Sequence, residues 1–120
     1  HFKLRLAETY LLKAEAEFRL GKTIEAAETL NIIRRRSNAS EITPDQVDID
    51  FILDERSREL VVEEHRRYTL IRCGKLIERA KLYNFNGGQF ITERDQLYPI
   101  PQEVIDANLT GDMPQNPGFN

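Results

Sequence analysis

The sequence predicts an all-α protein in which a helical hairpin is followed by further helices and by an irregular C-terminal tail rich in Pro and Asn. Over much of the first 82 residues, apolar side chains recur every three or four positions, which is the period of a helix. Alternating apolar and polar stretches, which are typical of strands, are nearly absent. Four of the five prolines follow residue 98, where they prevent long regular elements.

The hairpin is expected within residues 1–37. Its first helix should run from Leu4 to Leu20, and Gly21 should end it, because glycine readily takes the left-handed backbone found after helices. A second helix is expected from Thr23 to Arg36. Small side chains would let the two helices approach closely. The spacing resembles one tetratricopeptide hairpin in four residues, namely Ala14, Phe18, Gly21 and Ala26. One such hairpin cannot bury its own apolar faces.

Residues 37–50 read as a connector, with Asp48 or Asp50 starting the next helix. Residues 48–82 are expected to be helical, as two helices or as one helix bent between His65 and Thr69. Asn and Gly residues end this pattern after Leu82. Residues 83–120 should form loop and tail, with one short helix from Gln102 to Asn108, and side-chain contacts should hold the tail in place.

Charge and composition argue against several classes of partner. Seventeen Lys and Arg against twenty Asp and Glu give a net charge of -3, so nucleic acid and anionic lipid are poor partners. No apolar run approaches the roughly 18 residues of a membrane span.

The single cysteine, Cys73, excludes an internal disulfide and a cysteine-based zinc site, and a small buried hydrophobe is its expected role.

An acidic helix is the first candidate for chemistry, because Glu55, Glu59 and Glu63 lie at helical spacing along one face. Paired acids can act as general acid and base. Arginines interleave with them, however, and neighbouring guanidinium groups lower carboxylate pKa values instead of raising them. Structural ion pairs are therefore expected. The two histidines, His1 and His65, have no metal-ligand spacing. No catalytic residue, metal ligand or cofactor site is expected.

The second candidate is the loop from Tyr83 to Phe90, which combines aromatic rings with side-chain amides. Rings can stack on the apolar face of a sugar while amides bind its hydroxyl groups. Tyr83, Phe85 and Asn86 are thus candidate ligand-binding residues. A second interpretation stays open, in which Tyr83 and Phe85 anchor the loop and the Asn-Gly pair turns it.

Several strings of the sequence occur in an order that resembles a known family. They are Leu30–Arg36 (LNIIRRR), Glu55–Leu60 (ERSREL), Glu63, Arg66, Leu70–Arg72 (LIR), Tyr98–Ile105 (YPIPQEVI), Asn108 and Gln115–Phe119 (QNPGF). This series resembles the C-terminal region of the SusD/RagB family of Bacteroidetes. The chain departs from the family pattern at Glu64-His65, Thr69 and Cys73, which puts local polar networks in doubt and leaves the fold expectation unchanged.

The resemblance implies an all-α, tetratricopeptide-like protein that is a lipid-anchored nutrient-binding lipoprotein at the cell surface. It implies a non-enzymatic role, in which oligosaccharide is captured and passed to a TonB-dependent outer-membrane transporter of the SusC-like kind. Family members are much longer, so the 120 residues are expected to be a fragment, with the signal, the lipid anchor and most of the ligand site elsewhere. Peptide capture and a generic protein-interaction scaffold are the alternatives.

Overall fold

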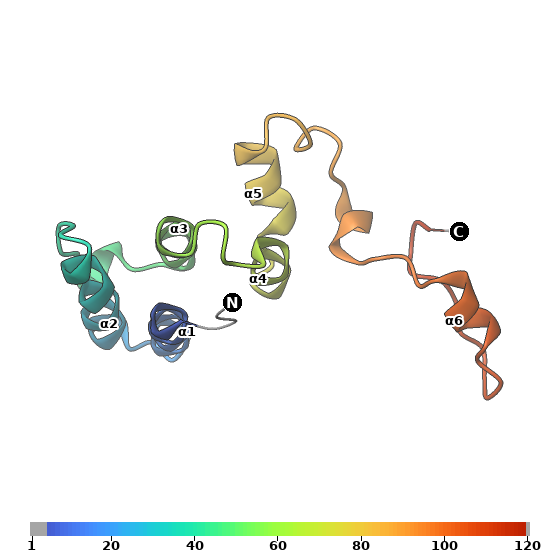
Figure 1. Ribbon diagram of the computed structural model, residues 1–120, viewed down its shortest axis with the longest axis horizontal. Coiled ribbons are helices and arrows are strands. Elements are labelled where there is room, and N and C mark those ends of the chain that lie inside the picture. Colours follow the sequence, from blue (N-terminus) through green and yellow to red (C-terminus); the bar gives the residue numbers. More distant parts are fainter. Residues whose placement is uncertain (1–4, 120) are drawn as a thin grey trace. The chain divides into compact units, whose positions relative to one another are not determined.

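The computed structural model describes residues 5–119 and confirms the all-α class, since these residues contain helices and no strand (Figure 1). The α-helices are α1 (Leu6–Arg19), α2 (Thr23–Arg36), α3 (Ile49–Glu59), α4 (Arg66–Arg72), α5 (Leu76–Tyr83) and α6 (Gln102–Asp106). Two short 3-10 helices are η1 (Pro44–Gln46) and η2 (Glu93–Gln96). The chain divides into two compact units, His1–Arg66 and Arg67–Asn120, which are described separately.

The first unit is built on the α1–α2 hairpin that the sequence predicts. The expected start at Leu4 lies outside the described residues, while α2 has the expected bounds. Gly21 has a φ of +76°, and the Lys22 N–H donates to the Glu17 carbonyl at 2.9 Å, which closes the turn after α1. Fully buried side chains fill the crossing of the two helices, and these are Leu11, Ala14, Ala26 and Leu30.

Polar side chains order the connector and start α3. The Asn31 amide is buried and makes two 2.9 Å hydrogen bonds, donating to the Ile42 carbonyl and accepting from the Ile42 N–H. This pairing carries Ile42 into the same core as Ile52 of α3. Of the two acids that the sequence offers as the helix start, Asp48 is the N-cap, because its Oδ1 accepts from the Phe51 N–H at 2.6 Å.

Residues 48–82 contain three helices, where the sequence predicts two or one bent helix. The first break is a turn at residues 60–65, in which the Leu60 carbonyl accepts from the N–H groups of Glu63 and Glu64, each at 3.0 Å. The second break follows α4 at Gly74, whose φ of +68° is the left-handed conformation that ends a helix. The first break lies next to the position near His65 where the sequence predicts a bend or a second helix, whereas the helical period continues across the second break and does not predict it.

Val62 lies in the first of these turns and has a strained backbone. Its φ is +65°, a conformation that β-branched residues rarely adopt, and its side chain is fully exposed. Changing Val62→Gly should therefore raise the free energy of unfolding of the full-length protein by about 1 kcal/mol, as relief of strain exceeds the entropy cost of glycine. Denaturant unfolding would measure this, with Val61→Gly as the control that should destabilise. A loss of stability in Val62→Gly would show that the valine side chain makes contacts that outweigh its strain.

In the second unit, side-chain hydrogen bonds hold the tail, as the sequence predicts. The Gln115 amide accepts from the Ile100 N–H at 2.7 Å and donates to the Ile100 carbonyl at 2.8 Å. The Asn116 amide donates to the Tyr98 carbonyl at 2.7 Å. Gly118, at a φ of +85°, lies so close to the Arg94 side chain that an added Cβ would be 2.7 Å from it. The Gln-Asn-Pro-Gly string therefore fixes the end of the tail against the Tyr98–Ile100 backbone and the Arg94 side chain.

A capping box orders η2 before the tail. The Asp95 carboxylate accepts from the Thr92 backbone N–H at 2.7 Å and from the Thr92 hydroxyl at 3.0 Å. These two hydrogen bonds hold the pKa of Asp95 below its usual value. Arg67 donates to the Asp95 carbonyl, and its guanidinium lies 4.5 Å from the centre of the Tyr98 ring.

Candidate functional site

The loop that follows α5 carries all three of the candidate ligand-binding residues. Helix α5 ends at Tyr83, and residues 85–90 form a run of turns. The Asn84 N–H still donates to the Ala80 carbonyl at 2.9 Å, so the loop leaves the helix in a defined direction. Tyr83 is therefore placed by the last turn of a helix, while Phe85 and Asn86 are placed by the loop.

Asn84 orders the first half of this loop. Its side-chain oxygen accepts from the N–H of Asn86 at 3.1 Å and from the N–H of Gly87 at 2.9 Å. An asparagine that binds backbone N–H groups two and three residues later forms an Asx-type turn. The main chain that carries Phe85 and Asn86 is thus tied to the end of α5. One of the two sequence interpretations assigns the turn to the Asn-Gly pair, whereas in the structure the Asn84 side chain forms it by accepting from the N–H groups of that pair.

Gly88 orders the second half by packing directly on α5. Its N–H donates to the Asn84 carbonyl at 2.8 Å, and the residue is buried. An added Cβ would be 2.3 Å from the Ala80 carbonyl oxygen and 2.6 Å from that of Asn84. Only glycine allows this approach. The Phe90 N–H then donates to the Gly87 carbonyl at 3.0 Å, so the loop is closed at both ends.

The aromatic rings on this ordered loop face solvent. Phe85 is 94% exposed and Tyr83 is 58% exposed. The buried Arg79 guanidinium lies 5.1 Å from the centre of the Tyr83 ring, which positions that ring on α5. Because Phe85 is almost wholly exposed, it does not anchor the loop within the described residues. The anchoring interpretation therefore fails for Phe85.

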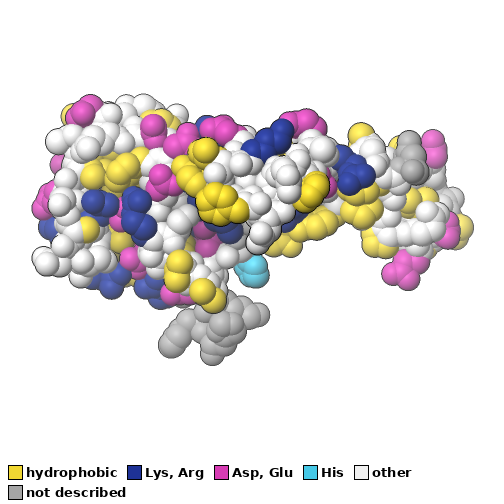
Figure 2. Space-filling view, turned by 90° about the horizontal axis from the view of Figure 1, so that it is seen from above, with side chains coloured by type: hydrophobic (Ala, Val, Ile, Leu, Met, Phe, Trp, Pro, Cys, Tyr) yellow, Lys and Arg dark blue, Asp and Glu magenta, His cyan; other side chains and the backbone are white. Residues whose placement is uncertain are grey.

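Two further residues contribute to this surface, although the sequence interpretation did not assign them to the site. Phe90 is 72% exposed, and Gln89 is exposed beside it. With Asn86 they add a third ring and two amides to the same loop. Figure 2 shows that hydrophobic side chains also reach the surface elsewhere, interspersed with charged ones. Aromatic residues separated by Asn, Gly and Gln are the sequence signal that would have included Phe90.

The acidic helix contains ion pairs, as the sequence predicts. The Glu55 carboxylate is bound by Arg34 and Arg58, each at 2.7 Å. Glu59 is bound by Arg36 at 2.7 Å and by Arg5 at 3.0 Å. Each of these carboxylates lies between two guanidinium groups.

Among residues 5–119 the structure has no cluster of three or more acidic, His or Cys side chains that could hold a metal ion. His1 lies outside the described residues.

Comparison with known proteins assigns the chain to a family. The model of the SusD family matches residues 1–119. The chain belongs to the SusD family. It is similar to the starch-binding protein SusD of Bacteroides thetaiotaomicron, at 35% identity over 96% of this chain and 21% of the relative. Two SusD-like proteins of Formosa agariphila match as well: P25, at 39% identity over 87% of this chain and 21% of the relative, and P38, at 41% identity over 62% and 17%.

The chain spans about a fifth of the length of these curated relatives. No solved structure gave a significant match. None of the helices described in residues 5–119 is long and apolar enough to span a membrane. The tail strings on which the sequence resemblance rests have a structural role here, since the side chains of Gln115 and Asn116 bind the backbone of Ile100 and Tyr98.

Proposed function

We propose that this chain is part of a non-catalytic protein that binds glycans during nutrient uptake. Membership of the SusD family and similarity to a protein whose name states starch binding support this proposal. The ion-paired acidic residues also favour binding over acid and base catalysis, because carboxylates such as Glu55 are held between guanidinium groups. The proposed ligand is an oligosaccharide, and no cofactor takes part.

Within these residues, the proposed glycan contact is the loop that carries Tyr83, Phe85 and Asn86. One observation carries this assignment: two exposed aromatic rings stand on a main chain that Asn84 and Gly88 hold in place. An aromatic residue whose main chain is ordered before binding loses less freedom when a sugar stacks on its ring. The Asn86 amide offers both a donor and an acceptor for sugar hydroxyl groups.

The protein is further proposed to act at the cell surface. The family resemblance implies a lipoprotein of the outer membrane. It also implies delivery of the captured glycan to a TonB-dependent transporter of the SusC-like kind. Co-purification of the full-length protein with such a transporter from outer membranes tests this part of the proposal. Isolation of the protein without any transporter under conditions that preserve known complexes of this type would contradict it.

Calorimetric titration of the full-length protein with a panel of oligosaccharides tests the glycan contact. Changing Tyr83→Ala and Phe85→Ala together should weaken binding about tenfold, because each stacked ring contributes about 0.5–1.5 kcal/mol. Phe85→Leu should weaken binding nearly as much as Phe85→Ala, since it keeps an apolar side chain and removes the aromatic face. That comparison separates stacking from general apolar contact.

Leu109→Ala is a matched control, because Leu109 is 92% exposed and lies on a different loop. It should leave glycan affinity unchanged. Glycan binding that survives in the Tyr83 and Phe85 double variant would contradict the assigned contact and leave the function intact. An unmodified protein that binds no glycan of the panel would contradict the proposed function itself. Binding of peptides in that case would favour peptide capture instead.

A generic interaction scaffold is the second candidate function. The hairpin of α1 and α2 favours it, because apolar side chains such as Leu6 and Ile32 remain exposed on these helices. Tetratricopeptide-like hairpins bind partners through such faces. Recovery of partner proteins by the full-length chain, with no binding to glycans, would support this candidate over the first.

A further inference from the structure

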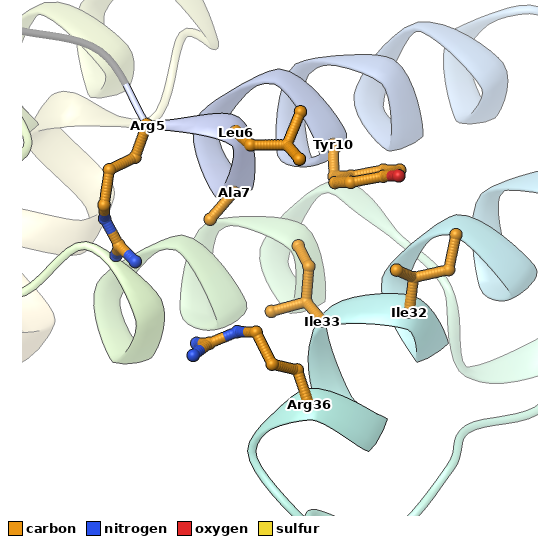
Figure 3. Close-up of a pocket in the computed structure, with 7 residues that line it drawn as sticks. All are labelled: Arg5, Leu6, Ala7, Tyr10, Ile32, Ile33 and Arg36. Carbon is orange, nitrogen blue, oxygen red and sulfur yellow. The ribbon is translucent and has the colours of Figure 1, made fainter.

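The apolar hollow between α1 and α2, about 440 Å³ in volume, already has its charged residues in ion pairs (Figure 3). Arg5 and Arg36 both bind the Glu59 carboxylate, at 3.0 Å and 2.7 Å. The other side chains that line it are Leu6, Ala7, Tyr10, Ile32 and Ile33. The charges of these lining residues are thus used within the hairpin. A chemically reactive position lies instead in the loop after α5.

This loop holds two neighbouring residues that can react with each other, Asn86 and Gly87. Theirs is the only Asn-Gly pair in the sequence. The backbone nitrogen that follows an asparagine can attack the side-chain amide carbon, and glycine hinders this attack least because it has no side chain. Asn86 is exposed, so water reaches its amide. Spontaneous loss of the amide therefore meets the least hindrance at this position of the chain.

The reaction would turn Asn86 into an acid without an enzyme. The Gly87 nitrogen loses its proton and bonds to the Asn86 Cγ, while the bond from Cγ to the amide nitrogen breaks and that nitrogen leaves with the proton as ammonia. The product is a five-membered succinimide ring. Water then opens the ring at either carbonyl, which leaves aspartate or isoaspartate at position 86. One water is consumed, one ammonia is released, and no oxidant or cofactor takes part.

In the structure, the Asn84 side chain holds the nitrogen that would attack. The Gly87 N–H donates to the Asn84 Oδ1 at 2.9 Å, and the same oxygen accepts from the Asn86 N–H at 3.1 Å. A backbone N–H that is hydrogen-bonded gives up its proton only after the hydrogen bond has opened. Asn84 therefore slows the first step of the reaction.

The main chain around the pair is also restrained. The Gly88 N–H donates to the Asn84 carbonyl at 2.8 Å, and the Phe90 N–H donates to the Gly87 carbonyl at 3.0 Å. Asn84 covers Gly87 closely, since an added Cβ there would be 3.1 Å from the Asn84 Nδ2. The Gly87 nitrogen can reach the Asn86 Cγ only if the main chain rotates between the two residues. These contacts oppose that rotation.

We propose that Asn86 is a site of spontaneous deamidation and that the Asn84 side chain controls its rate. In the folded loop the reaction is slow, and opening of the loop releases it. Deamidation places a negative charge in residues 82–92, a stretch without a charged side chain. It also replaces an amide that donates and accepts with a carboxylate that only accepts. The effect on glycan affinity rests on the proposed function, whereas the reaction itself does not.

Mass spectrometry of peptides from the incubated full-length protein tests the proposal. Conversion of Asn86 should be at least about tenfold faster in denaturant than in the native protein, because the whole loop is then open. The rate should rise with pH, since the Gly87 nitrogen must lose a proton. No conversion at Asn86 in denaturant would overturn the reactive site, and equal rates in the two conditions would overturn its protection.

Variants of Asn84, incubated well below their thermal transitions, test its control of the rate. Asn84→Ala should speed native conversion at least about fivefold, because no hydrogen bond to its side chain then has to open. Asn84→Asp keeps an acceptor in the same place and should stay close to the unmodified protein. Gln89→Ala, a change at an exposed position of the same loop, should have no effect.

The conversion of Asn38 in the same samples reports on global unfolding, because Asn38 is exposed and lies in the other unit. Its rate should be the same in all variants. An Asn84→Ala protein that converts Asn86 no faster than the unmodified protein would overturn the proposal, as would equally fast conversion in Asn84→Asp. Calorimetry on the deamidated fraction tests the glycan contact separately, so failure of one proposal is distinguishable from failure of the other.

Discussion

Changing Arg56→Met should lower the free energy of unfolding of the full-length protein by about 3 kcal/mol, because it removes a buried cation from its ion pair with the buried Glu64 carboxylate. Arg56 is 1% exposed and is the largest fully buried side chain among the described residues. Its guanidinium binds Glu64 of the following turn and contacts Glu8 of α1 at 3.4 Å. Methionine preserves the length and apolar contacts of the stem. Chemical denaturation would measure the loss.

A double variant separates the charge effect from packing. In Arg56→Met the Glu64 carboxylate keeps its ion pair with Arg66 at 3.1 Å but loses the one with Arg56, so adding Glu64→Gln should recover part of the lost stability. Arg35→Met is the control, since Arg35 and its partner Glu41 are both exposed and their ion pair should contribute under about 1 kcal/mol. A loss at Arg56 no greater than that at Arg35 would contradict the buried role.

The hairpin is the part of the fold that sequence predicts best, because its signals are local. The helical period and Gly21 define both helices within a few residues of their observed bounds. The bridge from Asn31 to Ile42 joins residues of different elements, and nothing in the sequence pairs them. The burial of Arg56 is likewise not predicted by the sequence. The interleaved Arg and Glu residues indicate ion pairs, but burial of one arginine depends on how α1 and α3 pack.

In the loop after α5, the sequence again predicts one part of the result and misses another. Its residue types point to a candidate contact surface, and the structure exposes Tyr83 and Phe85 as such a surface requires. The sequence does not show which residues hold the loop, because Asn84 acts by accepting from the N–H groups of Asn86 and Gly87, and Gly88 acts by packing on the Ala80 carbonyl. Sequence shows that Asn and Gly are present, but hydrogen bonding and close approach decide which of them orders the turn.

Changing Gly88→Ala should disrupt this loop and destabilise the full-length protein by about 2–3 kcal/mol, the cost of forcing an extra methyl group into a packed site. The new Cβ would be 2.3 Å from the Ala80 carbonyl oxygen, and backbone atoms cannot move aside as a flexible side chain can. The loop must then leave α5, and Phe85 loses its fixed position. If the loop binds glycan as proposed, affinity should fall by about as much as in the Tyr83 and Phe85 double variant, or about tenfold.

Gly111→Ala is the matched control for Gly88→Ala, because an added Cβ at Gly111 meets no atom within 4 Å and its φ is not positive. It should change neither stability nor affinity. Thermal unfolding and calorimetry on both variants therefore separate close packing from a general effect of losing glycine. A Gly88→Ala protein with unchanged stability would mean that the loop does not pack on Ala80, whereas lost stability with unchanged glycan affinity would place the sugar away from residues 83–90.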